Sequence, residues 1–176
     1  MHSNPPDTSV WLLAGPGHEP VLLETIARLS ALLGGAGFAP HVTIQGDIAM
    51  PRERLERPLA QLASRTPLQR WRVGRAECGT HFFRCIYLRF GASAAFDAMQ
   101  GAVQALTRTA EGLSPFPHLS LAYGDAHPDN EKMCALLDRE FMAQEIVFDR
   151  MALCRSSSHV PIAEWECLAQ YPLGQT

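Results

Sequence analysis

Two similar stretches of this sequence constrain its fold more than any other feature. The first runs from Phe38 to Asp47 and the second from Phe116 to Asp125, with His41 and His118 at corresponding positions 77 residues apart. Both contain, in order, an aromatic residue, a proline, a histidine, an apolar residue, a hydroxyl residue, an apolar residue and then Gly-Asp, with one-residue slips on either side. Each copy follows a predicted helix. The repeat therefore indicates two similar halves that face each other across a pseudo-two-fold axis.

The spacing within each copy has a meaning if the copy is a strand. Successive side chains of a strand point to opposite faces, so His41 and Thr43 share one face, and His118 and Ser120 share one face of the second strand. The apolar residues between them can pack beneath helices. Two such faces opposite each other would surround one small anion with two imidazoles and two hydroxyls.

The remaining hydrophobic pattern mixes helices with hairpins rather than alternating them regularly. Apolar spacing predicts helices over 20–33, 51–65, 96–106 and from Pro128 onward. It predicts strands over 9–14, 41–45, 69–77, 82–90, 118–123, 146–155 and 164–171. This order is typical of an α+β protein with largely antiparallel sheets. We expect a flexible tail over residues 1–8 and a single domain over residues 9–172.

Composition restricts the possible settings and partners. The formal net charge of −3 argues against a dedicated binder of long nucleic acid. The five cysteines are an odd number without a C-x-x-C pair or zinc-ribbon spacing, so we expect reduced thiols in a cytoplasmic protein. No secretory start and no membrane-spanning run is predicted.

One segment departs from this balance. Between Arg52 and Arg75 lie seven arginines and only two acidic residues, Glu53 and Glu56. Such a stretch is most often a solvated face. The alternative is an electropositive rim that attracts phosphate, to which the planar guanidinium is well suited.

The paired motifs match what cleavage of a phosphodiester requires. A neutral histidine can take a proton from water as it attacks phosphorus, and a protonated one can give a proton to the leaving oxygen. Because the imidazole pKa is about 6.5, both forms coexist near neutral pH. Hydroxyls of Thr43 and Ser120 can donate to the non-bridging oxygens. Either motif alone would be weak support, but two copies in matching context favour this chemistry, which needs no metal or other cofactor.

At these residues the chain resembles the 2H phosphoesterase superfamily, whose signature is two H-x-[T/S]-x motifs in a bilobal α+β fold. Within it, the resemblance is closest to the cyclic phosphodiesterases of plants and yeast, through the motifs and the Val10-Trp11-Leu12 and Phe83-Arg84-Cys85 strands. The resemblance implies two pseudo-symmetric lobes with antiparallel sheets lining a central cleft and helices outside. It also implies hydrolysis of ADP-ribose 1″,2″-cyclic phosphate or nucleoside 2′,3′-cyclic phosphates to monoesters.

The resemblance further assigns roles, although the sequence itself leaves the two halves interchangeable. It makes His41 the general acid on the leaving hydroxyl and His118 the base that activates water, while Thr43 and Ser120 bind the phosphate. Trp11, Phe83 and Tyr123 are then expected to line the nucleotide site, where an aromatic ring can stack on a base. All three lie in hydrophobic strands, so core packing is an equal alternative for them.

Three other functions are compatible with the motifs. The first is a 2′-5′ RNA ligase-like enzyme that acts on RNA 2′,3′-cyclic ends, which the arginine-rich stretch favours. The second is a nucleotide-binding module without turnover. The third uses His41 and His118 as zinc ligands, although zinc sites usually supply three or four ligands and no third is evident. We expect a monomer that acts on a small cyclic-phosphate nucleotide, with RNA ends as the alternative, and no membrane partner.

Overall fold

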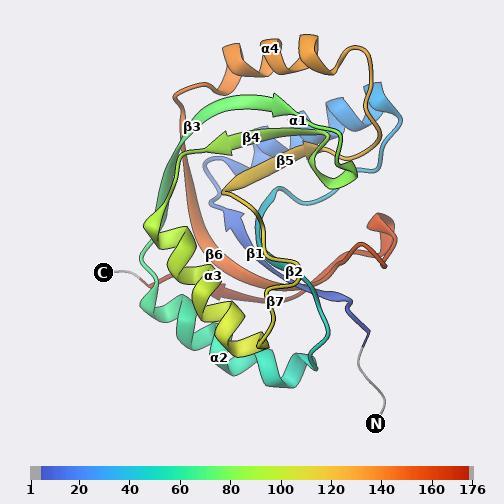
Figure 1. Ribbon diagram of the computed structural model, residues 1–176. Helices are drawn as coiled ribbons and strands as arrows, with labels where there is room; N and C mark the ends of the chain where they lie inside the picture. The colour runs from blue at the N-terminus through green and yellow to red at the C-terminus, as the bar shows by residue number, and fades with distance from the viewer. Residues whose placement is uncertain (1–4, 175–176) are drawn as a thin grey trace.

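The computed structural model describes residues 5–174 of the chain. This part contains seven strands and four α-helices (Figure 1). The strands are β1 (Thr8–Ala14), β2 (His41–Ile48), β3 (Gln69–Cys78), β4 (Ile86–Phe90), β5 (His118–Ala122), β6 (Glu145–Arg155) and β7 (Glu166–Pro172). The helices are α1 (Glu19–Leu33), α2 (Arg52–Arg65), α3 (Ala94–Thr107) and α4 (Asn130–Phe141).

All pairings among these seven strands are antiparallel. The strands follow the order β2-β1-β6-β3-β4-β5. Strand β7 pairs with residues 150–155 of β6, on the edge of β6 opposite β1. The long strands β3 and β6 join the two halves, because residues 69–72 of β3 pair with β6 whereas its later residues pair with β4. The α+β class with antiparallel sheets that the sequence predicts is therefore confirmed.

The helices exchange partners between the halves. Helix α1 follows β1 but packs against β5, and α3 follows β4 but packs against β2. In Figure 1, α1 and α4 lie over β3, β4 and β5, while α2 and α3 lie together at the other end of the molecule. Each motif strand is thus backed by a helix that follows a strand of the other half.

The alternation predicted for the two motif strands is present. Val42 and Ile44 of β2, and Leu119 and Leu121 of β5, are fully buried in the main hydrophobic core. Strand β1 is buried on both faces: Val10 and its alternate residues join that core, whereas the residues between them join a second, smaller cluster. That second cluster consists of Trp11, Leu13, Ala152 and Cys154, with Trp165 packed against it.

The two motif strands stand at opposite ends of the strand order, and the segment before β5 brings those ends together. Gly46 of β2 donates its backbone N–H to the carbonyl of Gly112 over 2.8 Å, and Gln45 and Leu113 form an isolated β-bridge. The side chain of Gln100, on α3, donates to the carbonyls of Ile44 and Ser114. Residues 109–115 are therefore attached to β2 immediately before the chain enters β5.

Two predicted strands begin later than expected. Residues 82–84, predicted as part of a strand over 82–90, form a 3₁₀ turn, because the N–H of Gly79 bonds to the carbonyl of Cys85 and closes a tight loop. Residues 162–164 form a second such turn before β7. Of the predicted tail, residues 1–4 lie outside the described residues, and Thr8 already belongs to β1.

Candidate active site

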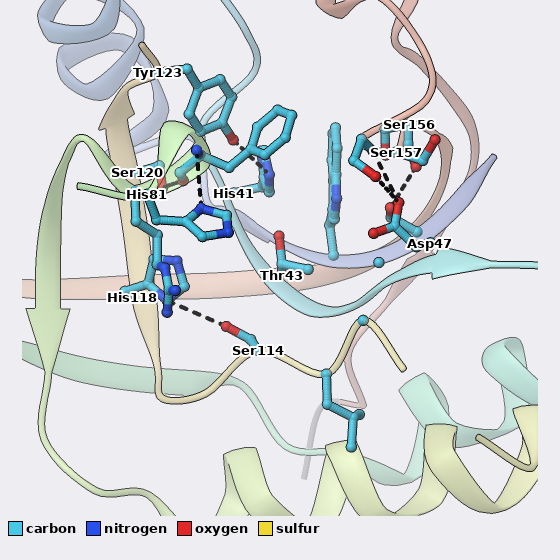
Figure 2. Close-up of a pocket in the computed structure, with 18 of the residues that line it drawn as sticks. His41, Thr43, Asp47, His81, Ser114, His118, Ser120, Tyr123, Ser156 and Ser157 are labelled. Carbon is cyan, nitrogen blue, oxygen red and sulfur yellow. Dashed lines mark hydrogen bonds between the residues drawn. The ribbon is translucent and has the colours of Figure 1, made fainter. Parts of the chain in front are cut away.

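A pocket of about 250 Å³ lies between β2 and β5 and contains every site residue predicted from the sequence. Its wall includes both motif histidines, both motif hydroxyls and the three predicted aromatic residues: His41, His118, Thr43, Ser120, Trp11, Phe83 and Tyr123. Figure 2 shows His41 and Thr43 on one side and His118 and Ser120 on the other. The fold thus unites residues that lie far apart in the sequence.

The two histidines are held in the same way. Nδ1 of His41 lies 2.6 Å from the carbonyl oxygen of Ala39, and Nδ1 of His118 lies 2.9 Å from that of Phe116. In each case the partner is the carbonyl two residues earlier. Because a carbonyl can only accept, Nδ1 carries the hydrogen in both rings. Nε2 is then the nitrogen left to exchange a proton with a ligand.

Aromatic rings enclose His41. The indole of Trp11 stacks on the imidazole with a centroid separation of 3.7 Å and an interplanar angle of 10°. The hydroxyl of Tyr123 lies 3.4 Å from Nε2 of His41, and Phe38 stacks on the Tyr123 ring. Burial raises the pKa of Tyr123, so its hydroxyl stays protonated and donates to Nε2. A ligand that engages His41 must replace this bond.

His118 has a more polar and more positive surrounding. The Ser114 hydroxyl lies 3.3 Å from its Nδ1. Arg84 lines the pocket nearby, and the guanidinium of Arg89 lies 3.9 Å from the centre of the Phe116 ring, which in turn packs edge-on against His118. Each imidazole is therefore held by the carbonyl two residues earlier, but the two rings lie in different environments.

Burial is the largest influence on the pKa of both histidines, and it lowers that pKa. His41 is 4% exposed and His118 is 7% exposed. Desolvation lowers the pKa of His41 to about 4, and the nearby His118 adds to this effect. Desolvation also lowers the pKa of His118 to about 4, with further contributions from Arg84 and Arg89. Both rings are thus neutral at pH 7 in the free protein, so protonation of one requires a compensating negative charge.

The two hydroxyls differ in availability. Thr43 follows His41 on the same face of β2, is half-buried and lines the pocket. Ser120 is buried, and its hydroxyl donates to the carbonyl of Phe83 over 2.8 Å. A ligand could therefore accept from Ser120 only after its hydroxyl rotated away from that carbonyl.

Several lining residues were not foreseen. Trp165 lies 6.0 Å from Phe83, ring centre to ring centre, at an interplanar angle of 24°. Trp165 follows the turn over 162–164. The predicted strand over 164–171 includes it, but nothing in its spacing indicates that it faces the pocket. Other unforeseen residues come from loops and turns: Ser114, His81, Arg84 and the run Ser156–Ser158. Ser156 and Ser157 lie near Asp47 in Figure 2, and Ser158 donates to the Asp47 carboxylate through its N–H and its hydroxyl. Loop residues carry no strand or helix spacing, so only the folded chain brings them together.

The arginine-rich stretch lies elsewhere. Its arginines belong to α2 and β3, and none of them lines the pocket. Arg52 pairs with Glu56, Arg70 with Glu145, and Arg75 with Glu77, all of them with largely exposed arginine side chains. The solvated-face interpretation therefore describes this stretch better than a phosphate-attracting rim does.

Residues 5–174 contain neither a cluster of metal-binding side chains nor a helix that could span a membrane. No group of three or more His, Cys, Asp or Glu side chains in this range is arranged to hold a metal ion. Among the same residues, no helix has the length and apolar character needed to cross a bilayer.

Comparisons with known proteins agree with this fold. A family model described as the 2′-5′ RNA ligase superfamily matches residues 21–159. The fold is similar to that of E. coli LigT in its apo form, with a TM-score of 0.61 and 16% identity over 98% of this chain and 100% of that one. LigT complexed with 3′-AMP gives a TM-score of 0.60 and 14% identity over the same shares.

A third structure, TT0787 of Thermus thermophilus, gives a TM-score of 0.59 and 16% identity over 96% of this chain and 99% of that one. At these identities the structural likeness shows the fold alone. No curated protein matches the chain significantly.

Proposed function

This chain belongs to the 2′-5′ RNA ligase superfamily, and from that premise we propose that it opens the cyclic phosphate of a small nucleotide by two-histidine acid–base catalysis without a metal ion. Membership supports a phosphoesterase-type hydrolase. The candidate substrates are ADP-ribose 1″,2″-cyclic phosphate and nucleoside 2′,3′-cyclic phosphates, which the resemblance of the two motifs implies. The comparisons do not show a particular closeness to the plant and yeast enzymes.

The observation that carries this proposal is the matched anchoring of the two histidines in one pocket. Both rings hold their Nδ1 hydrogen on a backbone carbonyl, which leaves two basic Nε2 atoms for one ligand. In the proposed reaction, one Nε2 takes a proton from water as the water oxygen bonds to phosphorus. The other Nε2–H gives its proton to the ester oxygen as the phosphorus–oxygen bond of the ring breaks. The product is a phosphate monoester with one free hydroxyl.

The surroundings of the two rings favour His41 as the acid and His118 as the base. An imidazolium at His41 would lie against the face of Trp11, where a cation is stabilised by the indole ring. An imidazolium at His118 would be repelled by Arg84 and Arg89. Charge repulsion and ring stacking thus support the same assignment that the resemblance implies.

The hydroxyls and aromatic residues have distinct proposed tasks. Thr43 is the better-placed donor to a non-bridging phosphate oxygen, since the Ser120 hydroxyl is engaged with Phe83. The face of Trp11 is occupied by His41, so we assign Trp11 to support of that imidazole rather than to base stacking. Phe83 remains a candidate for contact with the base, and Tyr123 for contact with the ligand near His41.

The pocket favours a small substrate over RNA. The arginine-rich stretch, whose composition favours RNA, does not line the pocket. We therefore place RNA ends second among the candidate substrates.

A panel of cyclic phosphates tests this function directly. It should include a nucleoside 2′,3′-cyclic phosphate, ADP-ribose 1″,2″-cyclic phosphate, and an RNA oligomer with a 2′,3′-cyclic end, all with a chelator present. We expect monoester formation from the small compounds, with the regiochemistry read by NMR. A strong preference for the oligomer that weakens with added salt would instead indicate an RNA enzyme. Binding without monoester between about pH 5 and 9 would indicate a binding module.

Sulfate binding should measure, without any turnover, the proton that one imidazole takes up when an anion binds. Because burial holds the pKa of both imidazoles near 4, the free protein enters the range of pH 5–8 with both rings neutral. A bound dianion raises the pKa of one ring, so binding takes up a proton wherever the pH is below that raised pKa. Sulfate affinity should therefore increase as pH falls, by at most about tenfold per pH unit for one proton.

Isothermal titration calorimetry in two buffers of different ionisation enthalpy would measure this proton uptake. Sulfate is a suitable probe because it stays dianionic throughout the range. The His41→Gln variant should lose most of the pH dependence, since the neutral amide cannot be protonated. Equal sulfate affinity of the wild-type protein at pH 5 and pH 8 would contradict the coupling.

A further inference from the structure

Cys154 and Cys167 lie directly opposite each other where β6 pairs with β7. Their Sγ atoms are 3.5 Å apart. Direct cross-strand partners have Cβ atoms about 4.5–5.5 Å apart, and disulfides need about 3.5–4.5 Å, so a small approach of the two strands suffices. Neither cysteine is in a disulfide, and the other three cysteines of the chain are also free.

The two thiols share a sheet face with the pocket. Cys154 pairs on its other side with Ser9 of β1, which lines the pocket. Cys154 also belongs to the small apolar cluster that contains Trp11, and Trp165 packs against that cluster. Because Trp165 lies two residues before Cys167, a bond between the cysteines would link the first residues of β7 to the apolar cluster that contains Trp11.

The two thiols are also unequal in a way that suits stepwise oxidation. Cys167 is exposed and Cys154 is fully buried. The hydrogen bond from Cys154, followed by smaller effects of Gln170 and Arg150, lowers the pKa of Cys167 to about 7. Burial raises the pKa of Cys154. Since the thiolate is the nucleophilic form, the accessible sulfur is the reactive one and the buried sulfur is in place to resolve it.

We propose that Cys154 and Cys167 form an oxidisable dithiol that a peroxide converts into a cross-strand disulfide beside the pocket. The Cys167 thiolate attacks one oxygen of hydrogen peroxide, a sulfur–oxygen bond forms, the oxygen–oxygen bond breaks, and hydroxide leaves and takes a proton. The Cys154 sulfur then attacks the resulting sulfenic acid, and the sulfur–oxygen bond breaks with release of water. In total, two thiols and one peroxide give one disulfide and two water molecules.

The sequence allows a clear assay of this reaction. Trypsin cleaves after Arg150 and Arg155, so it separates Cys154, in peptide 151–155, from Cys167, in peptide 156–176. The full chain would be treated with near-stoichiometric hydrogen peroxide, alkylated with iodoacetamide, digested without reductant and examined by mass spectrometry. We expect the two peptides to appear joined, with the loss of two hydrogens, in a chain that runs as a monomer on a non-reducing gel.

Three variants separate the roles of the sulfurs. Cys167→Ser should give no joined peptide, and in Cys154→Ser the sulfenic acid at Cys167 should accumulate and be trapped by dimedone. Cys78→Ser removes the other exposed cysteine and should behave as wild type. If Cys154→Ser fails to fold, the Cys167→Ser and Cys78→Ser results decide the matter. Recovery of Cys154 and Cys167 as separately alkylated peptides after Cys78 has been oxidised would overturn the proposal, as would a joined peptide confined to disulfide-linked dimers.

Discussion

Replacing His118 or His41 by alanine is expected to lower the rate of ring opening by about 10²–10⁴-fold each, while the protein stays folded. Each substitution removes a pocket Nε2 whose ring is held through Nδ1 by a backbone carbonyl. Neither side chain carries much of the core, because Val42, Ile44, Leu119 and Leu121 supply the buried faces of the two strands. The rate would be measured on a nucleoside 2′,3′-cyclic phosphate, and folding by circular dichroism and urea unfolding.

Two further variants make this result specific to the paired histidines. His159→Ala removes an exposed histidine outside the pocket and should leave turnover within a few-fold of wild type. The double variant His41→Ala/His118→Ala should be scarcely slower than either single variant, since an acid and a base that act in one step are not additive. A single variant that folds normally and retains near-wild-type turnover would remove its histidine from the proposed mechanism.

The shape of the pH profile would then distinguish the two roles. A profile that reports one acid and one base is bell-shaped, and its two limbs belong to the pair rather than to single residues. The proposed assignment puts the charged form on His41 because that ring stacks on Trp11. Substitution of Trp11 by leucine should therefore shift the limb that reports the acid to lower pH, with loss of the cation–π contribution.

Much of the fold was predictable because its elements follow simple periodicities. Alternation along β2 and β5 correctly divided each motif between the core and the pocket, as Val42 and His41 illustrate. The long helices were equally clear, and α1 begins and ends within one residue of its predicted limits, 20–33. These features depend on local sequence alone, which is why a single chain sufficed to identify them.

The parts that were missed depend on contacts that spacing does not encode. The residues Phe82–Arg84 have strand-like composition, but the tight loop that starts at Gly79 turns Phe83 and Arg84 into the pocket. Trp165 lies in the pocket only because β7 pairs with β6 and the preceding turn places it beside Trp11. Likewise, the paired motifs indicated a shared cleft, but not which contacts would hold the two strands together.

Substitution of Gly112 by alanine is expected to test those contacts, with a loss of about 3 kcal/mol or more in the free energy of unfolding. Gly112 has a φ of +72°, a backbone conformation that residues with a side chain rarely adopt. A Cβ there would overlap the carbonyl oxygen of Gly46. The segment would have to move away from β2 and break the hydrogen bond between Gly46 and Gly112. Urea unfolding followed by tryptophan fluorescence would measure the change.

The same substitution should also slow turnover of the molecules that remain folded. Residues 109–115 fasten β2 to the chain that enters β5 at His118, and they carry Ser114 against the His118 ring. A displacement of about 1 Å between catalytic groups can cost about 10²-fold in rate. The matched control is Gly46→Ala, whose Cβ would meet nothing closer than the Ser9 hydroxyl at 3.5 Å, and which should lose far less stability. If Gly112→Ala were destabilised yet turned over normally when folded, these contacts would support the fold without setting the distance between the two histidines.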